Sequence, residues 1–241
     1  MDNVILDIDF LILCGGRGRR LETITQGVPK PMAPIKNRPF LDYLMERIVL
    51  SGGRRVILLT GYRKEFIKAH YLNSPFRKKL EIQFSEENTP LGTGGALKQA
   101  ASLICHPDFF VINGDTFCEI RFHEMLKFHL EKKSLLTIAV TEGSAGSDIG
   151  ILRLDQMTYR VKDFLEKGIK EGGPLSPKWV NAGTYLMNQQ LFDFFPQRQE
   201  ISLEYDVFPN CVLENTYGYP FLGKFIDIGI PERYHAAIKL L

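Results

Sequence analysis

Residues 11–35, with the sequence LILCGGRGRRLETITQGVPKPMAPI, carry the clearest structural signal in this chain. An apolar run ends at Cys14, and glycines follow at positions 15, 16 and 18. Glycines let a backbone approach phosphate groups closely and point its N–H groups at them. Arg20 can add a fixed positive charge there, and Lys30 stands between two prolines that hold the chain extended. The segment therefore predicts a buried strand that leads into a phosphate-binding loop.

The loop matches neither of the two common phosphate-binding fingerprints. A P-loop would need a lysine followed by serine or threonine, and a dinucleotide-binding loop would need a glycine at its sixth position. A GGxG motif by itself is also typical of an ordinary turn that carries an exposed basic surface. The rest of the chain must therefore decide between these interpretations.

Short apolar runs alternate with amphipathic stretches in the first half of the chain. Short apolar runs predict buried strands, and apolar residues at helical spacing predict helices. This alternation is typical of βαβ units and a mainly parallel sheet, whose ligands bind beyond the carboxyl ends of the strands. The expected strands are residues 10–14, 56–60, 80–84 and 109–113, and the expected helices are residues 41–50, 63–71 and 93–103.

The second half has a more mixed pattern, in which turns rich in glycine and proline separate short strands. The strands expected there are residues 135–140, 150–153, 160–164 and 179–187, and helices are expected at residues 192–195, 204–214 and 232–241. We expect one domain over residues 1–241, with a nucleotide-binding half at about 10–130 and a substrate-facing half at about 131–241. We assign no function to the first nine residues.

Composition excludes several classes of protein. Hydrophobic residues make up 44% and charged residues 24% of the 241 positions, which is ordinary for a globular domain. The net charge of +2 argues against a nucleic-acid partner. No apolar run is long enough to span a membrane, and the start of the chain lacks a signal-peptide pattern. Four scattered cysteines form no CxxC pair. We therefore expect a soluble, cytoplasmic protein with free thiols.

The loop and four later motifs, in this order, resemble the sugar-phosphate nucleotidyltransferase family. The loop corresponds to GGxGxRL followed by PKPMxPI, and the later motifs are PLGTGGAL at residues 90–97, NGD at 113–115, NAGTYL at 181–186 and DIGIPERY at 227–234. The motifs span nearly the whole chain. The resemblance implies a Rossmann-like α/β fold with a mixed, mainly parallel sheet flanked by helices.

The family reaction joins a sugar 1-phosphate to the α-phosphorus of a nucleoside triphosphate and releases pyrophosphate. The resemblance implies that Arg20 and Lys30 grip the phosphates, and that Asp115 and Asp227 bind Mg²⁺, so that these four residues are catalytic. Mg²⁺ prefers oxygen ligands and substrate phosphates. Asn-Gly-Asp is also good turn chemistry, so Asp115 alone could be a turn residue.

The resemblance also implies where the nucleotide binds. Arg19 stands where the family commonly has threonine, and it either faces the phosphates or faces solvent. Glu87 lies five residues before Gly92, where relatives place a base-reading side chain. A carboxylate only accepts hydrogen bonds and suits the two adjacent donors of guanine, although Glu87 could equally be a surface charge. The expected nucleotide-binding residues are Leu13, Gly15, Gly16, Gly18, Arg19, Glu87, Gly92, Gly94 and Gly95.

For the sugar phosphate, the resemblance marks Gly150, Glu166, Lys167, Asn181 and Gly183. The chain looks most like the branch that transfers GMP from GTP to D-glycero-D-manno-heptose 1-phosphate, which gives GDP-heptose for surface polysaccharides. One alternative is a uridylyl- or thymidylyltransferase for a hexose or amino-sugar 1-phosphate. Another is a non-catalytic regulatory subunit that senses sugar nucleotides, although the four catalytic positions are all present. Small relatives are often dimers, so a homodimer is possible.

Overall fold

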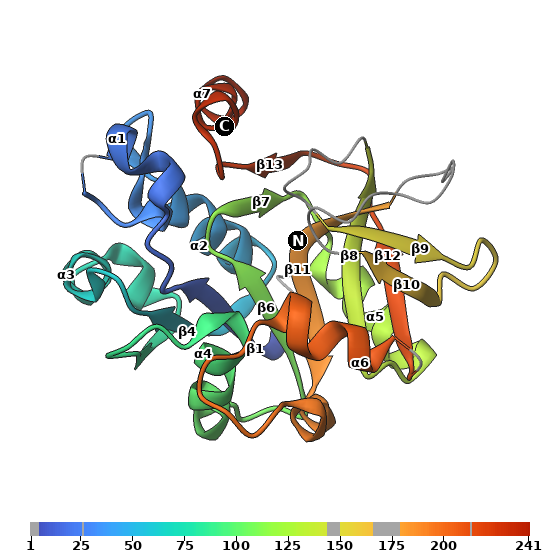
Figure 1. The fold of residues 1–241 in the computed structure, drawn as a ribbon. Coiled ribbons are helices and arrows are strands. Elements are labelled where there is room, and N and C mark those ends of the chain that lie inside the picture. The colour runs from blue at the N-terminus through green and yellow to red at the C-terminus, as the bar shows by residue number, and fades with distance from the viewer. Residues whose placement is uncertain (1–4, 26, 144–149, 166–178, 213) are drawn as a thin grey trace.

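The computed structural model describes residues 5–25, 27–143, 150–165, 179–212 and 214–241. Its centre is a twisted sheet with the strand order β10-β9-β11-β6-β1-β4-β5, and β8 and β12 continue from β11 (Figure 1). Strands β1, β4, β5 and β6 are parallel, whereas β11 runs antiparallel to β6. The predicted mixed, mainly parallel sheet flanked by helices is confirmed.

The first half supplies the parallel part of the sheet and most of its helices. Its strands are β1 (Leu6–Cys14), β2 (Pro34–Ile35), β3 (Arg38–Pro39), β4 (Gly53–Thr60), β5 (Glu81–Glu86), β6 (Asp108–Asn113) and β7 (Thr116–Cys118). Its α-helices are α1 (Glu22–Thr25), α2 (Phe40–Leu50), α3 (Lys64–Leu72), α4 (Gly92–Ala100) and α5 (Phe122–Lys132). Short 3₁₀ turns are η1 (Arg19–Leu21), η2 (Lys30–Met32), η3 (Pro75–Lys78) and η4 (Ala101–Leu103).

The second half adds mostly antiparallel strands and short helices. The strands are β8 (Leu136–Glu142), β9 (Ile151–Leu154), β10 (Val161–Leu165), β11 (Trp179–Asn188), β12 (Thr216–Pro220) and β13 (Phe225–Asp227). The helical elements are the 3₁₀ helix η5 (Gln189–Phe194), the π-helix η6 (Leu203–Val207), α6 (Phe208–Cys211) and α7 (Pro231–Leu240). The helix expected at residues 204–214 is thus a π turn followed by one short α turn.

Both faces of the sheet are buried, which explains the nearly continuous apolar strands. Successive side chains of a strand point to opposite faces, so Phe10 and Ile12 pack with α2 and α5 on one face. Leu11 and its neighbours pack with α4 and α6 on the other face. In the described part of the chain, no helix is long and apolar enough to cross a membrane. The four cysteines are free thiols, as expected.

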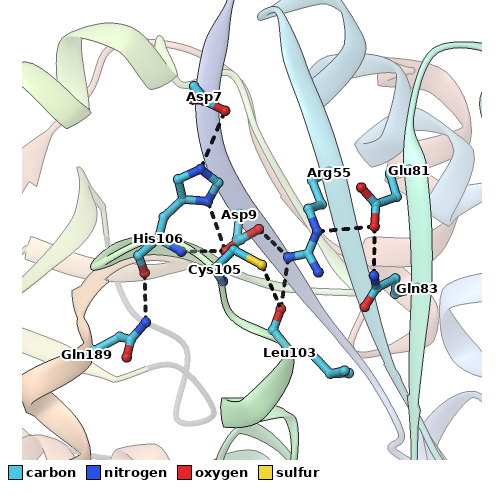
Figure 2. Close-up of polar contacts among 9 residues, drawn as sticks. All are labelled: Asp7, Asp9, Arg55, Glu81, Gln83, Leu103, Cys105, His106 and Gln189. Atoms are coloured by element: carbon cyan, nitrogen blue, oxygen red, sulfur yellow. Dashed lines mark hydrogen bonds and ion pairs between the residues drawn. The ribbon is translucent and has the colours of Figure 1, made fainter.

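No function is predicted for the first nine residues, yet part of that segment belongs to the central strand. Strand β1 begins at Leu6, and Asp9 is fully buried within it. Its carboxylate accepts hydrogen bonds from the Arg55 guanidinium and from the backbone N–H groups of Cys105 and His106 (Figure 2). Asp9 thereby joins β1 to β4 and to the turn before β6.

Candidate active site

A cleft of about 840 Å³ lies at the carboxyl ends of β1, β4, β5 and β6. It is lined by many of the predicted nucleotide-site residues, including the phosphate loop, and by polar residues that the sequence did not mark. The predicted residues that line it are Leu13, Gly15, Gly16, Gly18, Arg19, Lys30, Glu87, Gly92 and Asp115. Its position matches the rule that open α/β sheets bind ligands beyond the carboxyl ends of their strands.

Lys30 and Asp115 meet in the cleft although 85 positions separate them in the chain. The Lys30 ammonium group donates a short hydrogen bond to Asp115 Oδ2, and the two side chains are 11% and 29% exposed. Burial alone would raise the pKa of Asp115, but the Lys30 ammonium group outweighs burial and holds that pKa below its usual value. A fixed cation and an ionised carboxylate therefore stand side by side where phosphates would enter.

Asp227 is brought next to this pair by the small sheet of β7 and β13. Asp227 pairs with Thr116 in the strand register, and the Ile228 N–H donates to the backbone oxygen of Asp115 at 3.0 Å. Burial and the charge of Asp115 raise the pKa of Asp227. Arg233 holds its carboxylate at 3.1 Å. Asp227 is thus an electrostatic neighbour of Asp115, although it does not line the cleft itself.

Glu87 lines the cleft beside two glycines that leave room for its carboxylate. A Cβ atom at Gly15 would lie 2.7 Å from Glu87 Oε1, and one at Gly61 would lie 2.1 Å from it. Glu87 Oε2 accepts a hydrogen bond from the Leu91 N–H at 3.2 Å. Burial raises the pKa of Glu87. Glu87 is therefore a half-buried carboxylate in the cleft, and its role in reading the base stays a prediction.

Gly94 and Gly95 are buried under a crossing segment from the second half, residues 199–206. A Cβ atom at Gly95 would lie 2.4 Å from the Gln199 carbonyl oxygen, and the Gly94 N–H donates to the Ile201 carbonyl at 2.8 Å. Neither of these two glycines lines the cleft, and the expectation that they admit the nucleoside stays a prediction. The close approach that they permit is to the protein's own backbone.

The arginines of the loop divide between the cleft and the surface. Arg17 and Arg19 line the cleft, so Arg19 faces the cleft where relatives commonly have threonine. Arg17 also pairs with Glu22 at 3.1 Å. Arg20 is exposed on η1 and is absent from the residues that line the cleft. The catalytic role given to Arg20 stays a prediction.

The predicted sugar-binding residues that the structure describes meet at β11. The Asn181 N–H donates to the Gly150 carbonyl at 2.9 Å, and the Gly183 N–H donates to Asn181 Oδ1 at 3.0 Å. None of these three lines the cleft. Glu166 and Lys167 lie outside the described residues.

Several cleft residues carry little or no sequence signal, because they lie outside the motifs or in a motif that is also ordinary turn chemistry. The crossing segment contributes carboxylates and an aromatic ring, the β4–α3 turn contributes a tyrosine, and the end of β6 contributes an amide. These residues are Glu200, Glu204, Tyr205, Tyr62 and Asn113. Only Asn113 carried a sequence signal, as the first residue of the NGD motif. No group of three or more His, Cys, Asp or Glu side chains in the described ranges is arranged to hold a metal ion.

Comparison with known proteins agrees with this geometry. The model of the family described as Nucleotidyl transferase matches residues 10–241. The chain is 35% identical over 236 residues to the D-glycero-alpha-D-manno-heptose 1-phosphate guanylyltransferase of Aneurinibacillus thermoaerophilus, covering 97% of this chain and 98% of that protein. It is 32% identical to a mannose-1-phosphate guanyltransferase of Yarrowia lipolytica, covering 93% of this chain but 61% of that protein.

Among solved structures, HddC from Yersinia pseudotuberculosis superposes with a TM-score of 0.83 at 33% identity, covering 97% of this chain and 99% of that one. HddC has also been solved in complex with GMP-PN. The fold and the cleft together define an α/β protein with a glycine-rich loop at the carboxyl edge of its sheet. The chain belongs to the nucleotidyl transferase family, as its motifs predicted.

Proposed function

We propose that this protein transfers GMP from GTP to D-glycero-α-D-manno-heptose 1-phosphate, giving GDP-heptose and pyrophosphate. The observation that carries the proposal is the similarity to a heptose 1-phosphate guanylyltransferase over nearly the full length of both chains. The complex of HddC with GMP-PN supports a guanine nucleotide as the donor. Because both substrates are phosphorylated and do not cross membranes unaided, the enzyme would act in the cytoplasm.

The position of Glu87 supports guanine as the base of the donor nucleotide. Guanine presents two adjacent donors, N1–H and the 2-amino group, and a carboxylate can accept from both. Glu87 lies in the cleft with one oxygen bound to the Leu91 N–H. A uracil or thymine ring would place a carbonyl oxygen against this carboxylate, which would be repulsive. The uridylyl or thymidylyl alternative is therefore less well supported.

The reaction needs positioning and charge compensation more than proton transfer. A sugar phosphate has a second pKa of about 6, so at neutral pH its attacking oxygen is already mostly anionic. Lys30, with the backbone of the Gly15–Gly18 turn, would hold the triphosphate and stabilise charge as the α-phosphorus is attacked. Asp115 holds the Lys30 ammonium group at this place. The second substrate would approach from the β11 side of the sheet.

Asp115 and Asp227 fit a site for Mg²⁺ in their chemistry. Both offer hard oxygen ligands, and the mutual repulsion that contributes to the raised pKa of Asp227 would be relieved by a divalent cation. When bound, Mg²⁺ would compensate negative charge on the reacting phosphates. The two carboxylates would then be its protein ligands.

The test is pyrophosphate release, measured across GTP, ATP, UTP and dTTP with a panel of sugar 1-phosphates and Mg²⁺. The panel contains D-glycero-D-manno-heptose, mannose and glucose 1-phosphates, with Asp115→Asn as the inactive control. We expect turnover with GTP and the heptose phosphate. Turnover confined to UTP or dTTP would reject the guanine assignment. GTP binding without turnover on any sugar would favour the regulatory alternative.

Light scattering of the same preparation decides whether the protein is a homodimer.

A further inference from the structure

The end of β6 holds an amide whose buried oxygen is unused. Asn113 lines the cleft two residues before Asp115, and its side-chain oxygen Oδ1 is buried with no hydrogen-bond partner in the described part of the chain. A buried acceptor without a partner is costly and uncommon in folded proteins. Where such an acceptor lines a binding cleft, a donor group of the ligand can satisfy it.

The position of this amide is fixed by β11. Gly183 has a φ of +66°, and a Cβ atom there would lie 2.7 Å from Asn113 Nδ2 and 3.1 Å from its Cγ. Any larger residue at position 183 would therefore push the Asn113 amide out of place. The Gly183 N–H is in turn held by Asn181 Oδ1 at 3.0 Å. The NAGTYL motif thus acts on the cleft through Asn113.

This arrangement changes the expected role of Asn181. Its oxygen accepts from Gly183, and its nitrogen donates to the Tyr185 hydroxyl at 3.0 Å. Asn181 does not line the cleft, whereas Asn113 does. The amide available to a substrate is therefore Asn113, and Asn181 is a positioning residue.

The order of strands indicates which substrate reaches Asn113. Glu87 follows β5, Gly61 follows β4 and the phosphate loop follows β1, so a nucleotide base at Glu87 places its phosphates over β1. Asn113 ends β6, the next strand, on the side of β11. The acceptor sugar is the part of the reacting pair that lies beyond the phosphates in this direction.

We propose that Asn113 Oδ1 accepts a hydrogen bond from a hydroxyl group of the acceptor sugar and thereby helps to select that sugar. The proposal rests on the proposed function, since it assumes a sugar 1-phosphate as second substrate. The hydroxyl group keeps its proton, and no covalent step is involved. Asn113 is accordingly a specificity-determining residue.

The test replaces Asn113 by leucine, which has a similar shape and no hydrogen-bonding group. Because Asn113 Oδ1 has no partner in the free protein, the melting temperature of Asn113→Leu should stay equal to or above that of the wild type. The kcat/KM for the sugar 1-phosphate should fall about tenfold, as expected for one hydrogen bond, with the KM for GTP changed less than twofold. Asn73→Leu, an exposed position after α3, is the matched control.

Monodeoxy sugar 1-phosphates identify the hydroxyl group. For the analogue that lacks the bound hydroxyl, the wild type and Asn113→Leu should have equal kcat/KM. A lower melting temperature together with a rise in both KM values would mean that Asn113 is structural. A rise in the KM for GTP alone would place the contact at the ribose, and either result overturns the proposal. If the wild type turns over no combination of nucleotide and sugar 1-phosphate, the proposed function is rejected. Calorimetric binding of the sugar phosphate to the wild type and to Asn113→Leu then still tests the role of Asn113.

Discussion

At the scale of single residues, the pairing of Lys30 with Asp115 is the centre of the site. The ammonium group of Lys30 holds the pKa of the neighbouring Asp115 carboxyl below its usual value despite its burial, so the carboxylate is ionised. Such a cation, fixed before the substrate arrives, stabilises charge without reorganisation during the reaction. We therefore expect Lys30→Gln to lower kcat by about 100-fold or more, measured as pyrophosphate release. A kcat within threefold of the wild type would contradict this role.

The matched control is Lys78→Gln, at an exposed position of η3 away from the cleft. It makes the same change of charge and should leave kcat within twofold. If both variants lose activity equally, the loss comes from net charge or folding rather than from the position of Lys30.

Glu87 supports a prediction about pH and base preference. Burial raises its pKa, so the carboxylate becomes protonated at a higher pH than an exposed glutamate. Because only the ionised form accepts from both guanine donors, kcat/KM for GTP should fall as the pH drops through this raised pKa. Glu87→Gln should lower kcat/KM for GTP by about 10- to 100-fold and remove this acid limb. An unchanged pH profile in the variant would show that Glu87 does not read the base.

The cleft residues that could be predicted from the sequence lie in a motif or at a fixed distance from one. Lys30, Asp115 and Glu87 were found because each has a fixed offset from glycines or prolines. Gly94 and Gly95 show the limit of this approach, because a glycine indicates a close approach without indicating to what. Glu204 could not be found, since it reaches the cleft only through the packing of residues 199–206 on α4. The Thr93 hydroxyl links the two by donating to Glu204 Oε2 at 2.9 Å.

At the scale of elements, the buried charge of Asp9 holds three segments together. Its carboxylate accepts from the Arg55 guanidinium and from the N–H groups of Cys105 and His106 at 2.7 and 3.0 Å (Figure 2). Arg55 also donates to the Leu103 carbonyl at 2.9 Å. Removing the charge of Asp9 leaves the Arg55 side chain, which is 13% exposed, without its main partner.

We expect Asp9→Asn to lower the free energy of unfolding by about 2–4 kcal/mol, measured by urea titration. Asp7→Asn is the control, because Asp7 is 87% exposed and should change stability by less than about 0.5 kcal/mol. Burial alone would raise the pKa of Asp9, but Arg55 and the backbone donors lower it below 3.8. This stabilisation is therefore complete above pH 3.8 and is lost as the pH falls through the lowered pKa. The free energy of unfolding of Asp9→Asn should therefore depend less steeply on pH in that range than that of the wild type.

The elements that the sequence missed have weak or short signals. Helix α5 carries Phe122, Met125 and His129 on its buried side, but polar residues between them hide the helical spacing. Strands β7 and β13 have three residues each, too few for an alternating pattern. In contrast, strands β1, β4 and β6 were predicted within four residues at each end, because burial on both faces requires continuous apolar runs.

At the scale of the whole molecule, strands from the two halves join in one sheet, because β11 pairs with β6. This pairing places Gly183 of the second half against Asn113 of the first. The sequence predicts an alternating strand–helix pattern in the first half and a mixed pattern in the second. It does not predict which strands of the two halves pair, because register between distant strands is set by packing. The carboxylates Asp115 and Asp227 are likewise brought together only by the pairing of β7 with β13.

The pairing of β7 with β13, which brings Asp115 and Asp227 together, leads to a prediction about metal binding and stability. A ligand that binds only the folded state raises its stability, by about 2.7 kcal/mol when its concentration is 100 times the dissociation constant. Mg²⁺ added to the GTP-bound protein should therefore raise the melting temperature further, and Asp227→Asn should abolish this additional increment. Because burial and Asp115 already raise the pKa of Asp227, a neutral amide there should cost the metal-free protein little stability. Asp193→Asn, an exposed position, should keep the full increment. If Asp227→Asn also keeps it, Asp227 is not a metal ligand, and its raised pKa reflects only burial beside Asp115.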